Sequence, residues 1–334
     1  MTEIVKKSAP IILEEINKAK SILLHCHPSP DPDSVGSALA MKFALESLGK
    51  KVTLIQGDNE IPKAFEFPGV ETIVKKSYGE INTADYDLFI SQDASSKGMI
   101  SFLKEVIFPE NMKVIVIDHH ASNVGYGHIN CIDASYPATA QMIFDLLKEM
   151  NIKITHDIAL NLFMGIYTDT GGFQYGNTDY KTFDIVSELT ELAPEFAKTI
   201  FTMNNSKSKS ALIFDGLAIS SITEYYNGIL VIASVNFDQI TKNNINKEEI
   251  YSSNISNEIK SVEGYYIGAC MIETEQNIVK VSFRTRDENK YDVSRLAVAL
   301  GGGGHKAAAG VRLNMTMNEA INKVVETTKI IYNL

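Results

Sequence analysis

Short apolar runs alternate with amphipathic segments through the first half of the chain. The apolar residues within each run are contiguous, which is typical of parallel strands covered on both faces. These runs lie at residues 21–26, 51–56, 87–92 and 113–118. Helical spacing is found at residues 34–50, 137–150, 156–168 and 179–192. The alternation of strands and helices predicts a doubly wound, mostly parallel α/β domain.

Two helices near the N-terminus carry further local signals. Ser34 is the expected N-cap of the helix at 34–50, and Gly49 lies near its end. Before the first strand, one helical face is predicted for Ile11, Ile12, Ile16 and Ala19.

The pattern changes after about residue 190. A polar stretch at 203–210 is typical of a connector, and Asn227-Gly228 marks a turn between two strand-like runs. Further strands are expected at 265–273, 278–285 and 311–315, and helices at 246–260, 292–300 and 316–332. The sequence thus predicts an α/β domain over 1–190, a connector over 191–211 and a smaller α+β domain over 212–334, with a cleft between the domains.

Composition and charge narrow the class of protein. The 334 residues are 45% apolar and 22% charged, which excludes wholesale disorder, collagen and coiled coil. Residues 1–190 hold 16 Lys and Arg against 25 Asp and Glu, a net charge of −9 out of −10. All four arginines lie at or beyond residue 284. An acidic first domain argues against a protein that coats long nucleic acid, which needs a basic surface.

The three cysteines and the lack of targeting signals indicate where in the cell the protein is expected. Cys26, Cys131 and Cys270 are sparse and lack metal-ligand spacing, so we expect reduced thiols. No run approaches the roughly 20 apolar residues of a membrane span, and the first residues lack the apolar block of a signal peptide. We therefore expect a cytoplasmic protein with no membrane partner.

The densest chemical signal is the segment His27-Pro-Ser-Pro-Asp31-Pro-Asp33, which follows the first predicted strand. Its prolines stiffen the loop because proline fixes φ and restricts the preceding residue. Ligands of open α/β sheets bind at the carboxyl ends of the strands, where this loop is expected to lie. A proline-rich turn with helix-capping aspartates is the alternative interpretation.

Three further segments place an acid at the end of an apolar element. These acids are Asp93, Asp118 in Asp118-His119-His120, and Asp169 before a glycine pair. Each acid alone also fits a cap or a turn, and the histidines also fit a structural role. Together, carboxylates and imidazoles from four segments are the ligands that manganese, magnesium or zinc prefer. Two ions about 3.5–4 Å apart, bridged by one carboxylate, would neutralise this charge.

A glycine run lies near the end of the chain, in GGGGHKAAAG at 301–310. Such runs are also typical of flexible linkers, but structured segments flank this one closely. We expect the run to enter a helix and to offer backbone N–H groups to an anion. Arg284 and Arg286 alternate on the preceding strand, so we expect both on one face, near a phosphate. Two solvated arginines are the alternative.

In order and spacing these motifs resemble those of the DHH phosphoesterase family, and the resemblance covers nearly the whole chain. The segment from His27 to Ser37 corresponds to the first motif, Asp93 to the second, Asp118-His119-His120 to the third and Asp169-Thr-Gly to the fourth. GGGGHKAAAG with Arg284 upstream resembles the DHH-associated domain of the first subfamily, although Thr285 stands where Ser is expected. The resemblance is greatest to the nanoRNase type, which degrades short oligoribonucleotides and often dephosphorylates 3′-phosphoadenosine 5′-phosphate (pAp).

The resemblance implies a role for each motif residue. One metal ion would be bound by His27 and Asp31, a second by Asp33, His119 and Asp169, and both by Asp93. Asp118 would orient a histidine, and His120 would face the substrate phosphate or the leaving oxygen. The terminal phosphate or nucleotide end would be held by Arg284, Gly302, Gly303, Gly304 and His305.

The implied activity is hydrolysis of a phosphoester by water activated on two divalent metal ions, with Mn²⁺ expected. The implied substrates are short RNA or small phosphorylated nucleotides rather than long nucleic acid, and the family also suggests a homodimer. A close alternative is a phosphodiesterase for linear or cyclic dinucleotide second messengers, for which a preceding sensory domain is expected.

Three further alternatives are disfavoured. An inorganic pyrophosphatase shares the metal motifs but not the GGGGH-type second domain. A RecJ-type exonuclease for long DNA is expected to be a longer chain. A non-catalytic nucleotide-binding regulator is expected to have lost ligands, and none of the six proposed ligands is missing.

Overall fold

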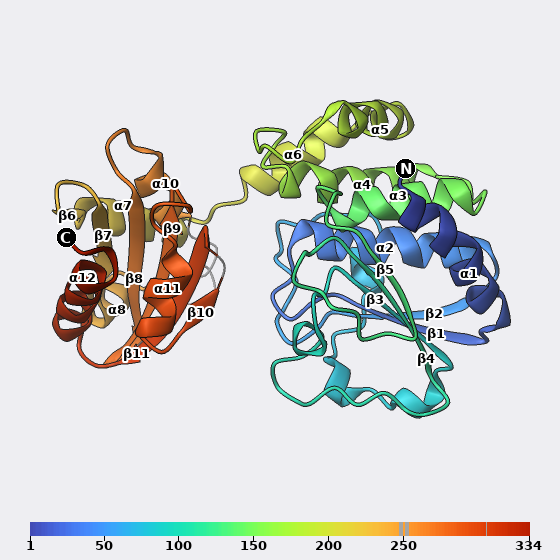
Figure 1. Ribbon diagram of the computed structural model, residues 1–334, viewed down its shortest axis with the longest axis horizontal. Helices are drawn as coiled ribbons and strands as arrows, with labels where there is room; N and C mark the ends of the chain where they lie inside the picture. The colour runs from blue at the N-terminus through green and yellow to red at the C-terminus, as the bar shows by residue number, and fades with distance from the viewer. Residues whose placement is uncertain (247–249, 251–253, 305) are drawn as a thin grey trace. The chain divides into compact units, whose positions relative to one another are not determined.

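The computed structural model describes residues 1–246, 250, 254–304 and 306–334. The chain forms two compact units, Met1–Ser206 and Lys207–Leu334, each built around its own sheet (Figure 1). Among the described residues, no helix combines the length and the apolar character that a membrane crossing requires.

The first unit contains a five-stranded sheet in which all neighbouring strands are parallel. Its strands are β1 (Ser21–His25), β2 (Lys51–Ile55), β3 (Leu88–Gln92), β4 (Lys113–Asp118) and β5 (Ile129–Ile132). The order is β2-β1-β3-β4-β5, so the chain reverses its direction of winding between β1 and β3. Ligands of such sheets bind at this switch point, outside the carboxyl ends of the strands. The α/β class and the four predicted strands are confirmed.

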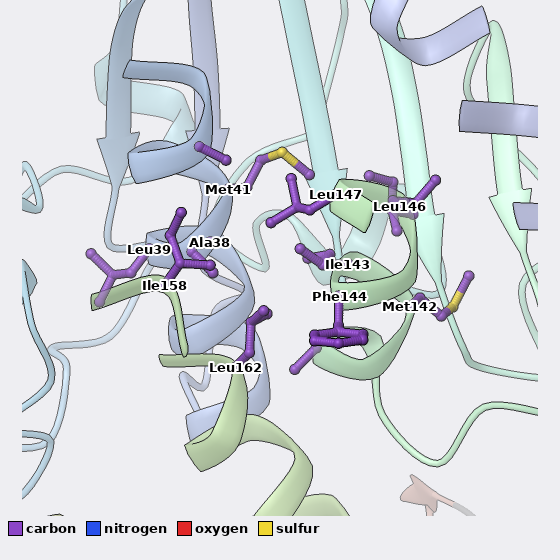
Figure 2. Packing of buried hydrophobic residues seen from close by; sticks show 14 of the residues in the cluster. Ala38, Leu39, Met41, Met142, Ile143, Phe144, Leu146, Leu147, Ile158 and Leu162 are labelled. Atoms are coloured by element: carbon purple, nitrogen blue, oxygen red, sulfur yellow. The ribbon is translucent and has the colours of Figure 1, made fainter. Parts of the chain in front are cut away.

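The α-helices of the first unit all lie on one side of its sheet (Figure 1). They are α1 (Glu3–Lys18), α2 (Pro32–Ser47), α3 (Thr139–Glu149), α4 (His156–Asp169), α5 (Tyr180–Leu192) and α6 (Phe196–Asn204). Figure 2 shows buried side chains of α2, α3 and α4 meeting there, with Leu39, Ile143 and Ile158 fully excluded from solvent. α5 and α6 pack on α4, and the ring of Phe196 lies 4.8 Å from that of Phe163.

The opposite face of this sheet is covered without α-helices. Phe89, Val114 and Val116 pack there against apolar residues of the segment between β3 and β4 and against Tyr78. This covering includes short 3₁₀ helices at Tyr78–Glu80 and Lys97–Met99. The two faces of the parallel sheet are therefore both buried, as the contiguous apolar runs predict, but by different kinds of structure.

Two local expectations in this unit are wrong. Ile11 is 49% exposed, whereas Ile12 and Ile16 are buried, because residues 11 and 12 point about 100° apart around a helix. The N-cap of α2 is Asp31, whose carboxylate accepts from the Ser34 N–H at 2.9 Å. The Ser34 hydroxyl is inside the helix and accepts from the His27 backbone N–H at 2.9 Å, which holds the loop to the helix.

The second unit contains a mixed six-stranded sheet in the order β10-β11-β9-β8-β7-β6. Its strands are β6 (Thr223–Tyr225), β7 (Leu230–Val235), β8 (Ile267–Glu275), β9 (Ile278–Thr285), β10 (Gly303–Gly304) and β11 (Ala308–Asn314). The β7–β8 pair is parallel and the other pairs are antiparallel. The mixed sheet and its helices confirm the prediction of a second, smaller α+β fold.

Helices cover both faces of the second sheet. One face packs on α11 (Val293–Ala299) and α12 (Met317–Tyr332), and the other on α7 (Lys209–Ser220), α8 (Phe237–Lys242) and α10 (Ile255–Ser261). The last part of the helix expected at 246–260 is α10. Most of its earlier part, residues 246–254, lies outside the described residues. The predicted turn at Asn227-Gly228 is present, with positive φ at both residues.

Candidate metal centre

The sequence-predicted acids and histidines of the first unit meet at the carboxyl ends of three strands. His27 follows β1, Asp93 follows β3, and His119 and His120 follow β4. Asp33 lies in the first turn of α2, and Asp169 is the last residue of α4. The segments converge where β1 and β3 form the switch point of the sheet.

A first group with the composition of a metal site consists of His27, Asp31 and Asp93. His27 Nε2 lies 3.2 Å from Asp31 Oδ2 and 3.7 Å from Asp93 Oδ2. His27 and Asp93 are buried, and Asp31 is partly exposed. One imidazole and two carboxylates at this spacing can surround one divalent cation.

A second group consists of Asp33, His119 and Asp169. His119 Nε2 lies 3.4 Å from Asp169 Oδ2 and 3.6 Å from Asp93 Oδ1. The two oxygens of Asp93 therefore face different histidines, Oδ2 toward His27 and Oδ1 toward His119. A carboxylate placed in this way is suited to bridge two cations.

The ring of His119 is set up to bind a metal through Nε2. Its Nδ1 lies 3.3 Å from the carbonyl oxygen of Tyr136, which can only accept, so we place the proton on Nδ1. His119 Nε2 is buried and has no hydrogen-bond partner in the described protein. A buried lone pair aimed at two carboxylates fits a cation between them, so the residues present fit a metal.

Burial and like charge act against ionised acids in this centre. Burial, followed by the charges of Asp33 and Asp31, raises the pKa of Asp93 well above its usual range. The same causes in the same order raise the pKa of Asp169 to about 9. Burial also raises the pKa of Asp33, although two backbone N–H groups oppose this effect. Cations between the carboxylates would offset the repulsion.

The first turn of α3 holds two of the acids. The Asp33 carboxylate accepts from the Thr139 N–H at 2.7 Å and from the Ala140 N–H at 2.9 Å. The Thr139 hydroxyl donates to Asp93 Oδ1 at 3.0 Å. The sequence motifs do not include Thr139 and Ala140. In the structure the N-cap of α3 is Ala138, whose methyl group cannot accept a hydrogen bond, so the N–H groups of this first turn are free for a partner from elsewhere in the chain.

Close approach and unusual backbone conformation also shape the centre. Asp93 has a φ of 53°, in the left-handed region that non-glycine residues rarely occupy. A Cβ at Gly165 of α4 would lie 2.7 Å from Asp33 Oδ1, and one at Gly36 of α2 would lie 2.3 Å from the Asn161 carbonyl oxygen. These glycines let α2 and α4 approach closely enough to present Asp33 and Asp169 together.

Asp118 and His120 form a pair beside the two groups. Asp118 is fully buried, and its Oδ1 lies 2.8 Å from His120 Nδ1. This hydrogen bond is the main cause that raises the pKa of His120. His120 Nδ1 also lies 3.8 Å from Asp93 Oδ1, and Asp93, His119 and His120 together form a third group with the composition of a metal site.

The candidate anion-binding residues of the second unit lie at one end of its sheet. Arg284 is on β9 and pairs in register with Ala308 of β11. The glycine run does not enter a helix, which corrects our expectation. It follows α11, and Gly303 and Gly304 form β10 against β11. His305 lies outside the described residues.

The position of Arg286 also differs from our expectation. Its guanidinium donates to the carbonyl oxygens of Lys260 and Ser261, at 3.0 and 2.6 Å. These carbonyls end α10, so Arg286 caps a helix rather than extending beside Arg284 toward a phosphate.

The fold and the site define a class of protein, an α/β protein with a candidate divalent-metal centre at the switch point of a parallel sheet. Residues 21–166 match the DHH family, N-terminal domain, and residues 229–329 match the DHHA1 domain. The chain belongs to the DHH phosphoesterase family.

Full-length relatives share both domains. The chain is 28% identical to the bifunctional oligoribonuclease and PAP phosphatase NrnA of Thermus thermophilus, over 95% of this chain and 93% of that protein. It is 25% identical to the protein of the same name from Bacillus subtilis, over 90% and 92%.

Solved structures share the fold. An exopolyphosphatase-related protein from Bacteroides fragilis superposes with a TM-score of 0.90 at 24% identity, covering 100% of this chain and 99% of that one. RecJ from Thermus thermophilus in complex with Mn²⁺ superposes with a TM-score of 0.55 at 12% identity, covering 99% and 55%.

Proposed function

We propose that the protein hydrolyses short oligoribonucleotides to mononucleotides and pAp to AMP. The observation that carries this proposal is the Asp93 carboxylate, whose two oxygens face one histidine of each ligand group. The substrate class is supported by the relatives named above, which align over nearly the whole chain. Hydrolysis of a dinucleotide second messenger would use the same centre, but no observation favours it over short RNA and pAp.

Two divalent cations fit the centre. One would be held by His27, Asp31 and Asp93, and the other by Asp33, His119 and Asp169, with Asp93 shared. Bound cations supply positive charge for the phosphoryl oxygens and lower the pKa of a water molecule toward neutrality. Manganese is our proposal for the metal, because these ligands are hard carboxylates mixed with imidazole. The homodimer and the cytoplasmic location stay predictions.

His120 is the proposed general acid. Its Nδ1 is engaged by Asp118, so Nε2 is the ring atom available to the substrate. The hydrogen bond to Asp118 raises the pKa of His120 and so favours the protonated form of the ring. His120 is partly exposed, as a group that meets substrate must be. We propose that Nε2–H gives its proton to the leaving oxygen as the phosphoester bond breaks.

Recognition is proposed to involve the second unit. Arg284 would contact the terminal phosphate, because a guanidinium forms charged hydrogen bonds with phosphate oxygens. The backbone of Gly302, Gly303 and Gly304, and His305, would contact the same end of the substrate. The charge of −9 on residues 1–190 supports a substrate of few phosphates over long nucleic acid.

A substrate panel with Mn²⁺ tests the function. Purified protein is incubated with a labelled RNA dinucleotide, pAp, longer RNA, a cyclic dinucleotide and pyrophosphate, and products are separated by chromatography. We expect mononucleotides from the dinucleotide and AMP from pAp, with slower cleavage of the other substrates. If the dinucleotide and pAp both stay intact, the proposal is wrong. Asp93→Ala protein in parallel excludes a contaminating nuclease.

A further inference from the structure

The buried carboxylate of Asp118 has one partner for each of its oxygens. Oδ1 lies 2.8 Å from His120 Nδ1, and Oδ2 accepts from Asn123 Nδ2 at 2.7 Å. Asn123 is only 9% exposed, and the sequence motifs described above do not include it. The side chain that faces His120 is thus itself held by a second buried side chain.

Every polar atom of the Asn123 side chain is used. Nδ2 donates to Asp118 Oδ2 and also to the carbonyl oxygen of Ala94 at 3.2 Å. Oδ1 accepts from the Gly125 N–H at 2.9 Å. These contacts fix the orientation of the amide, because an N–H donor requires Oδ1 and two oxygen acceptors require Nδ2. Asn123 therefore connects Asp118 to the carbonyl group of Ala94, the residue that follows Asp93.

Tyr126 holds the same carbonyl group. Its hydroxyl donates to the Ala94 carbonyl oxygen at 2.9 Å and lies 2.6 Å from Ser91 Oγ. Ser91 Oγ in turn lies 2.9 Å from Nε2 of the fully buried His25. Since Asp93 has a left-handed backbone, two side chains on the next carbonyl help to keep that conformation.

The arrangement determines how the ring of His120 lies. Asn123 occupies Asp118 Oδ2, which leaves Oδ1 to accept from the Nδ1–H of His120. Without Asn123, the Asp118 carboxylate would lose a buried donor and would rotate to find another. The ring would then lose its orientation and its preference for a proton on Nδ1.

We propose that Asn123 is a positioning residue that acts on His120 through Asp118. Tyr126 supports it by holding the shared Ala94 carbonyl. The effect on catalysis rests on the proposed function, whereas the effect on the His120 ring does not.

Two substitutions remove the donor in different ways. Asn123→Asp keeps the shape and the acceptor for Gly125, and Asn123→Leu keeps the approximate volume without a polar atom. We expect both to lower kcat for the dinucleotide by about 10-fold to 100-fold, as for loss of other groups that orient an active side chain. KM should change by less than about 3-fold, because Asn123 has no proposed contact with substrate.

A matched control comes from the same segment. Asn130 makes two hydrogen bonds with the backbone of Gly127 and none with Asp118. We expect Asn130→Ala to keep kcat within about 2-fold. If both Asn123 variants are folded and also stay within about 2-fold of the wild-type kcat, the proposal is overturned.

A spectroscopic measurement separates positioning from general stability. Nitrogen NMR of the metal-free protein at alkaline pH reports which ring nitrogen carries the proton, and His120→Gln assigns the signal. We expect the proton on Nδ1 of His120 in the wild type and a mixture of tautomers in the Asn123 variants. An unchanged signal would overturn the proposal.

The remaining outcomes are also decisive. If both Asn123 variants unfold, Tyr126→Phe replaces them, and we expect it to lower kcat by about 3-fold to 10-fold. A Tyr126→Phe enzyme with wild-type kcat would then overturn the proposal. If the wild type cleaves neither the dinucleotide nor pAp, the proposed function fails, and the NMR signal alone decides the role of Asn123.

Discussion

The carboxylate of Asp33 caps a helix that begins 106 residues later, at Thr139. Asp33 lies on α2, and the capped N–H groups belong to α3, so one side chain joins two helices at the metal centre. The backbone N–H groups and the positive end of the helix favour the charged carboxylate that a cation needs. The position of this ligand is therefore set by helix packing as well as by its loop.

Loss of the shared ligand should abolish activity. We expect Asp93→Ala to lower kcat/KM for the dinucleotide by at least about 100-fold, because loss of groups that only support a ligand already costs 10-fold to 100-fold. Steady-state assays with Mn²⁺ measure this. Asp184→Ala removes an exposed acid on α5 and should retain wild-type activity. Full activity in Asp93→Ala would show that the assigned centre is incorrect.

The stability of the metal-free protein should fall as the pH rises from about 4 toward 9. The folded pKa of Asp169 is about 9, far above its value of about 3.8 in the unfolded chain. Between these values the folded state holds more protons than the unfolded state, so raising the pH favours unfolding. Thermal unfolding in EDTA at several pH values measures how steeply Tm falls with pH.

Mn²⁺ should counteract this loss, because the ligands bind metal in their deprotonated form. We expect the increase in Tm on adding Mn²⁺ to be larger at pH 8 than at pH 6. Asp169→Asn cannot titrate, and it should flatten the slope of the metal-free protein. If the stability of the metal-free Asp169→Asn variant fell with pH as steeply as that of the wild type, the raised pKa would not belong to Asp169.

A side chain at Gly165 should destabilise the first unit. Its Cβ would lie 2.7 Å from both Ala140 Cβ and Asp33 Oδ1, and we expect Gly165→Ala to cost about 1–3 kcal/mol, as overpacking does. Gly216 of α7 is the matched helical control, since a Cβ at that position would have no neighbour within 4 Å. Gly216→Ala should be neutral or stabilising by up to about 1 kcal/mol. Urea unfolding compares them, and a wild-type midpoint for Gly165→Ala would refute the close packing.

Substitution of Arg284 should weaken substrate binding without affecting the metal. We expect Arg284→Ala to raise KM for pAp by about 10-fold to 100-fold, equivalent to the 1.5–3 kcal/mol of a charged hydrogen bond. The rise in Tm with Mn²⁺ should be unchanged, because the ligands belong to the first unit. Arg312→Ala is the control, since Arg312 is exposed and lies 3.7 Å from Glu275. An unchanged KM in Arg284→Ala would remove Arg284 from the proposed recognition site.

Much of the fold could be predicted because the strands of the first unit are buried on both faces. Contiguous apolar runs located β1 to β4 within about one residue. β5 was missed because it is short and its Asn130 is exposed, so it has no apolar run. The strand at Gly303-Gly304 was also missed, because it depends on pairing with Ala309 and Gly310 rather than on its own residues.

The ligand side chains of the centre could be predicted from the sequence, but the groups that hold them in place could not. Asp and His are recognised as potential metal ligands by residue type alone, so the sequence indicated all six proposed ligands. The groups that hold them are largely backbone atoms, such as the Thr139 N–H and the Tyr136 carbonyl oxygen. Every residue carries such atoms, and only the fold determines which of them meet a ligand.

The three cysteines are all buried and free, with Cys26 and Cys131 in the first unit and Cys270 in the second. Burial raises the pKa of each thiol, so a thiol reagent should react slowly while the protein is native. Labelling followed by peptide mass analysis would then report the opening of each unit separately. The wild-type protein thus carries its own probes of local unfolding, without an added fluorophore.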